Sequence, residues 1–305
     1  MKFAVESWSP DYGASSDDAV LAESDAVVDA WVERSVDRWE PIRPAAGQRP
    51  PASMLFIDGV RRVESVVWIT GDDGLTNQGI CASYAAGAVR CNGSAEVVQT
   101  EVRRGLFCPA EHATAIETHH GRFELHAVAN DEPINLSLAL QRKMGDLEGV
   151  VAAQAGTAEV VVVDGPLKVG QDRPGFVGFI KTHRRSYGET IVQQTIGRLD
   201  CRERTPLLVI DAIRPRYSWY QRLPCEITHG WAGIVRLETP TGQPVDEVIA
   251  LADQLTATLP RFSSSPHKDP RAPQNLVPIG GLERELRRRL GDPQLLLRAL
   301  RVAAG

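Results

Sequence analysis

The alternation of hydrophobic and polar positions along the chain predicts strands and helices in turn. Continuous apolar runs typical of buried strands lie at 54–57 and 160–163. The same kind of pattern predicts further strands at 63–70, 79–89, 122–128, 176–181, 206–210 and 232–237. Apolar residues at helical spacing predict helices over 15–39, 136–151 and 245–259. Three early strands, a helix and a further strand indicate an α/β fold that begins with an antiparallel meander.

The N-terminal part is predicted to be distinct from the main domain. Ser15-Ser16-Asp17 caps a helix whose apolar positions continue to Trp39, and residues 44–51 form a proline-rich connector. We therefore divide the chain into a helical arm and linker, residues 1–50, and an α/β domain with a C-terminal helix, residues 51–305. The apolar stripe of the arm, with Trp31 and Trp39, packs on the domain or docks on a partner.

Composition narrows the class of protein. The chain is 43% hydrophobic and 24% charged, as in soluble globular proteins, and its five cysteines lack the CxxC spacing of zinc sites. Unpaired cysteines suit a reducing cytosol. We find no apolar stretch typical of a signal peptide or a membrane span, and we expect a cytoplasmic protein without membrane contact. The net charge of −5 means that any nucleic-acid-binding surface must be local.

The motif that points to chemistry is an apolar, strand-like run ending in Asp-Gly, and it occurs twice. The first run ends in Asp58-Gly59 and the second in Asp164-Gly165. Either copy alone is also explained by a turn that follows a core strand. Two carboxylates on neighbouring strands, however, are suited to binding divalent metal between protein and phosphate. The sequence therefore predicts a shared Asp58–Asp164 metal site.

A third carboxylate is expected from a helix. Glu148 lies on the flank of the apolar seam of the helix at 136–151, from which it could reach the ends of both strands. Glu124 is the rival third ligand, and a solvated position on the helix surface is the alternative for Glu148. Three carboxylates would neutralise much of the charge of two divalent ions, one activating water and one stabilising the leaving oxygen. The order of meander, helix and Asp strand is that of an RNase H-like domain.

Two other motifs are set aside. His119-His120 resembles a pair of metal ligands, but adjacent residues on a strand point to opposite faces, and we predict a turn there. Gly280-Gly281 lacks the surrounding pattern of a nucleotide-binding loop.

At these residues the sequence resembles the NurA nuclease family. The resemblance lies in Phe-Ile-Asp58-Gly59, in Met144-Gly-Asp-Leu147-Glu148, and in Val-Val-Val-Asp164-Gly-Pro-Leu167. Phe176-Val-Gly178-Phe-Ile-Lys181 follows at the position of the family's Gly-x-x-Lys strand. The resemblance covers roughly residues 50–290 and depends on the order of these short motifs.

The resemblance implies a fold, an activity and partners. The expected fold is an RNase H-like (PIWI-like) mixed sheet flanked by helices. The expected activity is exo- and endonuclease cleavage of single- and double-stranded DNA ends, with Mn²⁺ or Mg²⁺, in end resection and repair. The expected partners are DNA, a second copy of the chain in a homodimer, and a hexameric HerA-type ATPase. Carried over residue by residue, Asp58, Glu148 and Asp164 would be the catalytic metal ligands.

Basic residues cluster where a nuclease would need them. Arg61 follows the first Asp, and Lys181, Arg184 and Arg185 end the strand after the second. We predict that these four bind DNA phosphates, although solubilising charge is an equal alternative. A second set, in which aromatics that could stack on unpaired bases follow two arginines, consists of Arg214, Arg216, Tyr217, Trp219 and Tyr220.

The C-terminal part departs from the family pattern. Where relatives have an active-site Tyr and a downstream His, this chain has Ala272 and Gly280. Neither can transfer a proton. We predict that the loop around Asn275 closes over the metal site and that Asn275, or alternatively Gln274, replaces the missing groups by hydrogen bonding. An ordinary proline-bounded turn is the alternative.

Three other functions compete with the nuclease. The chain could be a non-catalytic RNase H-like module that binds DNA or docks an ATPase, or a resolvase-type nuclease specific for branched DNA. An actin-like sugar kinase would also have two Asp-Gly strands, but no glycine-rich phosphate loop follows Asp58. Retention of all three acidic residues favours the nuclease.

Overall fold

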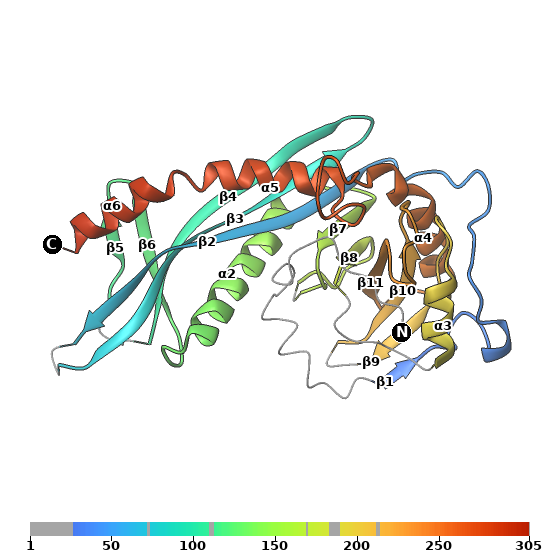
Figure 1. Ribbon diagram of the computed structural model, residues 1–305, viewed down its shortest axis with the longest axis horizontal. Helices are drawn as coiled ribbons and strands as arrows, with labels where there is room; N and C mark the ends of the chain where they lie inside the picture. The colour runs from blue at the N-terminus through green and yellow to red at the C-terminus, as the bar shows by residue number, and fades with distance from the viewer. Residues whose placement is uncertain are drawn as a thin grey trace.

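The computed structural model describes residues 27–71, 74–109, 113–168, 170–182, 190–211 and 214–304. Its framework is one mixed, mostly antiparallel sheet of eleven strands in the order β1-β9-β10-β11-β8-β7-β2-β3-β4-β6-β5, with helices on both faces (Figure 1). The predicted α/β class, with a mixed sheet flanked by helices, is therefore confirmed.

Long strands build one half of the sheet. β2 (Met54–Thr70), β3 (Thr76–Cys91) and β4 (Ala95–Cys108) form an antiparallel meander whose far end projects from the rest of the molecule (Figure 1). β6 (Gly121–Ala127) pairs with β4 in parallel, and β5 (Ile116–Thr118) closes this edge.

The first Asp-Gly motif does not end a strand. The strands predicted at 54–58 and 63–70 are one strand, β2, in which Asp58 pairs with Gly87 of β3 and Gly59 with Ala86. A bulge between Val63 and Ser65 is the main irregularity of the β2–β3 pairing. The predicted end of the strand at Asp58 is therefore wrong, because pairing along β3 outweighs the turn preference of Asp-Gly.

The other half of the sheet is built from shorter strands. β7 (Val160–Asp164) pairs with β2 in parallel, and β8 (Phe176–Ile180) pairs with β7 in parallel. The remaining four strands are antiparallel to their neighbours: β11 (Ile234–Pro240), β10 (Arg216–Arg222), β9 (Leu208–Asp211) and β1 (Val27–Asp29).

Successive side chains of a strand point to opposite faces of the sheet, and their contacts show which helices cover each face. Leu55 and Ile57 of β2 pack against α2 (Pro133–Gln154), whose buried seam runs from Leu136 to Val151 as predicted. α3 (Thr190–Arg198) packs on β9 and β10 from this same side.

The opposite face of the sheet packs against the remaining helices. Phe56 of β2 belongs to the core under α4 (Val245–Thr258), and Val60 to the core under α5 (Val277–Arg289). α6 (Pro293–Ala303) continues from α5 over the far end of the meander, and η3 (Leu259–Phe262) follows α4 (Figure 1).

The predicted N-terminal helix is wrong over the part that the structure describes. Residues 27–39 contain strand β1, which pairs with β9, and the short 3₁₀ helix η2 (Val36–Arg38). Trp39 is 1% exposed, and its indole Nε1 donates to the Ala30 carbonyl at 2.6 Å. Trp39 therefore belongs to the core and not to a docking surface. Residues 15–26 of the predicted helix lie outside the described residues.

Several strands and helices of the structure were not predicted from the sequence. These are β4, β10, α3 and α6. Charged residues interrupt the apolar positions of β4 and β10, so neither strand shows the apolar pattern by which strands are recognised. Within the described residues, no helix is long and apolar enough to cross a membrane.

Candidate metal centre

The two aspartates come together through strand register. β2 and β7 run in parallel with Ile57 opposite Val163, so that Asp58 and Asp164 follow as neighbours. Asp58 lies two residues after Phe56, and Asp164 lies two residues after Val162. Residues two apart on a strand point to the same face, and Phe56 and Val162 pack in the core under α4. Asp58 and Asp164 therefore point to the face covered by α4 and α5, as a shared site requires.

The third acidic residue of this group is Glu283 of α5. Ligand oxygens of Asp58, Asp164 and Glu283 all lie within 4.8 Å of one another. Leu282 and Leu286 of α5 pack on the sheet next to Val60, which places the intervening Glu283 beside the aspartates. Glu283 was not predicted from the sequence, although it adjoins the apolar positions Leu282 and Leu286 as Glu148 adjoins the seam of α2.

Asp58 is a buried carboxyl group whose ionised form has few compensating partners. Its side chain is 7% exposed, and Oδ1 accepts a hydrogen bond from the Gly59 amide at 2.7 Å. Oδ2 is buried and has no hydrogen-bond partner among the residues that the structure describes. Burial raises the pKa of Asp58 well above its ordinary value, the Asp164 carboxylate raises it further, and the Lys181 ammonium partly opposes both.

These features fit a divalent cation. Carboxylate oxygens are the preferred ligands of Mg²⁺ and Mn²⁺, and three converge here from two strands and a helix. A cation would compensate both the unpartnered Asp58 oxygen and the mutual repulsion of the carboxylates. The donor set therefore suits a hard, oxygen-binding metal.

Lys181 supplies a positive charge directly beside the aspartates. Its ammonium donates to Asp164 Oδ2 at 2.6 Å and to Asn275 Oδ1 at 2.9 Å. The predicted loop therefore does approach the centre, because Asn275 is fully buried and shares Lys181 with Asp164. Asn275 Nδ2 in turn donates to Asp269 Oδ2 at 2.6 Å.

Arg271 closes the same network from the other side. Its Nε donates to Asp269 Oδ1 at 3.2 Å, and its Nη1 donates to Glu283 Oε1 at 3.0 Å. Partial burial tends to raise the pKa of Asp269, but hydrogen bonds from Asn275 and Arg271 outweigh it and lower that pKa. We call the resulting chain of contacts the polar ring: Asp164, Lys181, Asn275, Asp269, Arg271 and Glu283.

Glu148 lies close to Asp58 but on the other face of the sheet. It is 2% exposed, so that a solvated position on the helix surface is excluded, and its Oε2 accepts from Lys168 Nζ at 2.9 Å. A Cβ built on Gly59 would lie 2.7 Å from Glu148 Oε1, which places the carboxylate directly over Gly59. Its charge contributes to the raised pKa of Asp58. The role of Glu148 as a ligand stays a prediction.

Glu124 is placed far from the aspartates in the sheet. It lies on β6, which β3 and β4 separate from β2, and its carboxylate pairs with Arg122 at 2.9 Å. Its side chain is 57% exposed. The geometry therefore favours Glu148 over Glu124 as a neighbour of the centre.

The residues predicted to bind DNA are spread over different environments. Lys181 belongs to the polar ring, and Arg61 faces α2, where its Nη1 donates to Ser137 Oγ at 3.0 Å. Arg184 and Arg185 lie outside the described residues. The predicted stacking platform is wrong, because all three of its aromatics are buried in the core: Tyr217, Trp219 and Tyr220.

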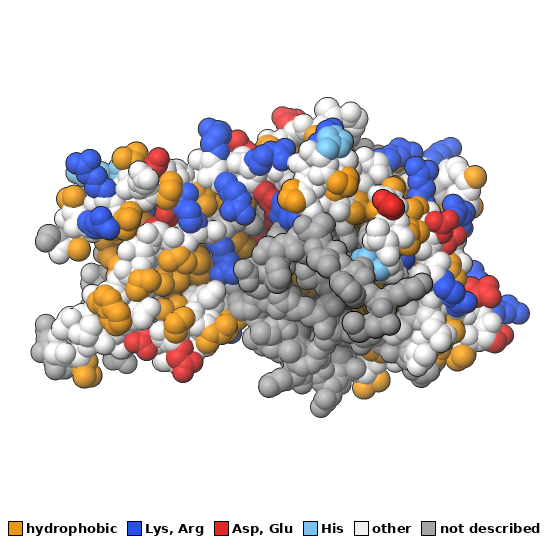
Figure 2. Space-filling model, viewed as in Figure 1, with side chains coloured by type: hydrophobic (Ala, Val, Ile, Leu, Met, Phe, Trp, Pro, Cys, Tyr) orange, Lys and Arg blue, Asp and Glu red, His pale blue; other side chains and the backbone are white. Residues whose placement is uncertain are grey.

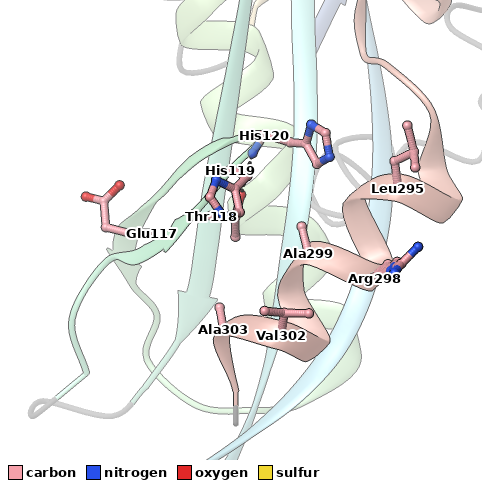
Figure 3. A pocket seen from close by; sticks show the side chains of 9 residues that line it. All are labelled: Glu117, Thr118, His119, His120, Leu295, Arg298, Ala299, Val302 and Ala303. Carbon is pink, nitrogen blue, oxygen red and sulfur yellow. Dashed lines mark hydrogen bonds between the residues drawn. The ribbon is translucent and has the colours of Figure 1, made fainter.

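The histidine pair lies at the other end of the molecule. His119 and His120 form the β5–β6 turn, as predicted, and line a cavity of about 510 Å³ against α6 (Figure 3). The cavity is otherwise lined mainly by small and aliphatic residues of α6. Within the described part of the chain, Asp58, Asp164 and Glu283 are the only group of three potential metal ligands.

Comparison with known proteins does not assign the chain to a family. No protein-family model matches it, and no curated protein matches it in sequence. The chemistry of the centre therefore has to follow from its own residues.

A pair of glycine substitutions tests the packing of Glu148. We expect Gly59→Ala to cost about 1–3 kcal/mol of unfolding free energy, because its Cβ would lie 2.7 Å from Glu148 Oε1 and 2.9 Å from Met144 Cγ. Gly149→Ala has open space around it and should instead gain about 0.5–1 kcal/mol, as alanine usually does within a helix. Urea unfolding measures both, and equal effects of the two variants would contradict the placement of Glu148 over Gly59.

Proposed function

We propose that this protein is a divalent-metal-dependent deoxyribonuclease with an RNase H-like fold, similar to the NurA nucleases, that acts on DNA ends. The observation on which this depends is the group of Asp58, Asp164 and Glu283, of which Asp58 is buried and the other two are half-buried, and in which one Asp58 oxygen has no partner among the described residues. Such a group is costly without a cation.

The order of the central elements supports the RNase H-like part of the proposal. An antiparallel meander, β2-β3-β4, leads through α2 to β7 and β8, which lie parallel to β2. The two aspartates sit on the adjacent parallel strands at the middle of this arrangement, where that fold holds its carboxylates. Six further strands extend the sheet beyond this unit.

Each residue of the centre has a role in this proposal. Asp58, Asp164 and Glu283 would hold Mn²⁺ or Mg²⁺, which when bound supplies activation of water and stabilisation of the leaving oxygen. Lys181 places a fixed positive charge beside Asp164, where it can stabilise charge that develops on a phosphate. Asn275 orients Lys181 and is a positioning residue.

Glu148 is proposed as a further ligand. It is near enough to act on Asp58, but Lys168 occupies one of its oxygens. Joining the centre would require Glu148 to release Lys168 and to reach past Gly59 from the other face of the sheet. A crystal structure with Mn²⁺ decides this, and a Glu148 that still pairs with Lys168 beside a bound ion would exclude it.

DNA would approach along positively charged surface. Figure 2 shows Lys and Arg side chains gathered over α5, the helix that supplies Glu283, and over α6. The exposed arginines of these helices include Arg287, Arg288, Arg298 and Arg301. The predicted contacts of Arg184 and Arg185, the homodimer and the HerA-type ATPase remain part of the proposal, and co-purification with the ATPase tests the partnership.

The decisive experiment is cleavage of end-labelled single- and double-stranded DNA with Mn²⁺. We expect the wild type to shorten labelled ends with Mn²⁺ and not with EDTA, and Asp164→Asn to be inactive. Metal binding without cleavage of any DNA would favour the non-catalytic module. Cleavage restricted to branched DNA, with linear ends intact, would favour the resolvase-type nuclease.

A further inference from the structure

We propose that Arg271 is a positioning residue of the metal centre, which sets the affinity for divalent cations by fixing Glu283 against Asp58 and Asp164. This inference builds on the metal-binding part of the proposed function. It does not depend on the nuclease activity.

The contacts of Arg271 are those of a rigid support. Two guanidinium nitrogens bind the two oxygens of Glu283, with Nη1 to Oε1 at 3.0 Å and Nη2 to Oε2 at 2.5 Å. The Arg271 backbone amide and Nε both donate to Asp269, at 2.8 and 3.2 Å. Both side chains of the Arg271–Glu283 pair are less than a fifth exposed. A planar guanidinium held at both edges fixes the carboxylate in orientation as well as position.

Glu283 needs such a support because its neighbours repel it. Asp58 and Asp164 place two like charges within 4.8 Å of its ligand oxygen. A free glutamate on α5 could rotate its flexible side chain away from them. Arg271 opposes this rotation, and each carboxylate oxygen retains a lone pair for a cation.

The positive charge of Arg271 does not by itself oppose the cation. Asp269 binds the other edge of the guanidinium, and hydrogen bonding from Asn275 and Arg271 lowers the pKa of Asp269 so that it stays ionised. Asp269, Arg271 and Glu283 together have a formal charge of −1. The three side chains therefore still attract a cation, and the ordering of Glu283 by Arg271 outweighs the positive charge that Arg271 adds.

The test is calorimetric titration of Mn²⁺ into the metal-free protein, which needs no DNA. Arg271→Met should weaken Mn²⁺ binding about 10–100-fold, the usual effect of losing a group that orients a metal ligand. Arg271→Lys keeps the positive charge but cannot bind both oxygens of Glu283 through two nitrogens, and it should recover only part of the affinity. Lys268→Met, in the same loop, removes an equal charge from an exposed side chain and should leave the affinity within about twofold.

The outcomes separate this inference from the function. An Arg271→Met protein that is folded and binds Mn²⁺ as tightly as the wild type overturns the role of Arg271 while the metal centre stands. Should Arg271→Met not fold, Asp269→Asn, which weakens the anchor of Arg271, must lower Mn²⁺ affinity several-fold, and unchanged affinity overturns the role as well. A wild type that binds Mn²⁺ but cuts no DNA overturns the nuclease proposal alone.

Discussion

Asp58→Asn is expected to abolish DNA cleavage and at the same time to make the metal-free protein more stable. The amide cannot bind a divalent cation as a carboxylate does, so that several kcal/mol of transition-state stabilisation would be lost. This corresponds to a fall in rate of at least about 10²–10³-fold. Cleavage of end-labelled DNA at saturating Mn²⁺ measures the loss.

The gain in stability has a different origin. Asp58 is buried, Oδ2 has no partner among the described residues, and burial followed by the Asp164 charge raises its pKa. A neutral amide removes the cost of this charge while it can still accept from Gly59. We expect the Tm in EDTA at neutral pH to rise by roughly 2–4 °C, which corresponds to about 1 kcal/mol in a protein of this size.

The gain should depend on pH in a defined direction. The folded-state pKa of Asp58 lies above its unfolded-state value, so the folded wild type is favoured below the unfolded pKa and loses that stability as the pH rises through the folded pKa. Asparagine does not titrate. The advantage of Asp58→Asn should therefore disappear in acid and grow as the pH rises through the folded-state pKa of Asp58.

An exposed aspartate provides the control for Asp58. Asp146 on α2 has a side chain that is 72% exposed, and Asp146→Asn should leave stability within about 0.5 kcal/mol and cleavage unchanged. A destabilised Asp58→Asn protein in EDTA would contradict the picture of an uncompensated carboxylate. Cleavage near the wild-type rate would remove Asp58 from the centre.

Lys181→Met is expected to destabilise the metal-free protein strongly and to be rescued in part by Mn²⁺. The ammonium is buried and binds both Asp164 and Asn275. Removing one partner of a buried ion pair typically costs about 3–5 kcal/mol, because the other charge is left uncompensated. Here the acidic group would also lose the cation that partly offsets the repulsion at Asp58.

Rescue by Mn²⁺ is the informative part of this experiment. A divalent cation provides positive charge to the same carboxylates, so that saturating Mn²⁺ should stabilise Lys181→Met more than it stabilises the wild type. Urea unfolding with Mn²⁺ and with EDTA measures both effects. Lys143→Met, which removes an exposed lysine that pairs with Asp146, should change stability by no more than about 0.5 kcal/mol and respond to Mn²⁺ like the wild type.

The opposite result would favour the predicted role of Lys181 as a contact to DNA phosphates. If Mn²⁺ stabilises Lys181→Met and the wild type equally, the lysine and the metal do not share ligands. A flatter salt dependence of DNA binding in the same variant would then identify Lys181 as a phosphate contact.

The sequence alone identified the elements whose pattern is local. The seam of α2, the buried strand β7 and the helix α4 follow from periodicities that depend only on neighbouring residues. The two aspartates were also found in this way, because a polar residue that follows a buried strand stands out against its apolar run. Their pairing was an inference from the repeat of the motif.

Tertiary structure decided the features that depend on distant partners. Pairing with β3 carries β2 straight through Asp58-Gly59, where local preference indicates a turn. Pairing with β9 makes a strand of Val27–Asp29, and burial in a shared core takes Trp39 away from the surface. In each case contacts between residues far apart in sequence outweigh a local preference worth about 1 kcal/mol or less.

Some residues of the candidate site could likewise be named from the sequence, whereas others join the site only through tertiary packing. Asp58 and Asp164 could be named from the chain because each is marked by its own strand. Glu283 could not, because it joins them only when Leu282 and Leu286 pack α5 across the sheet. The polar ring likewise connects β7 to a loop and a helix more than a hundred residues away. The sequence marked the two aspartates that become neighbours on adjacent strands, whereas packing determined which helix brings the third carboxylate, since only the folded chain sets the distance between charges.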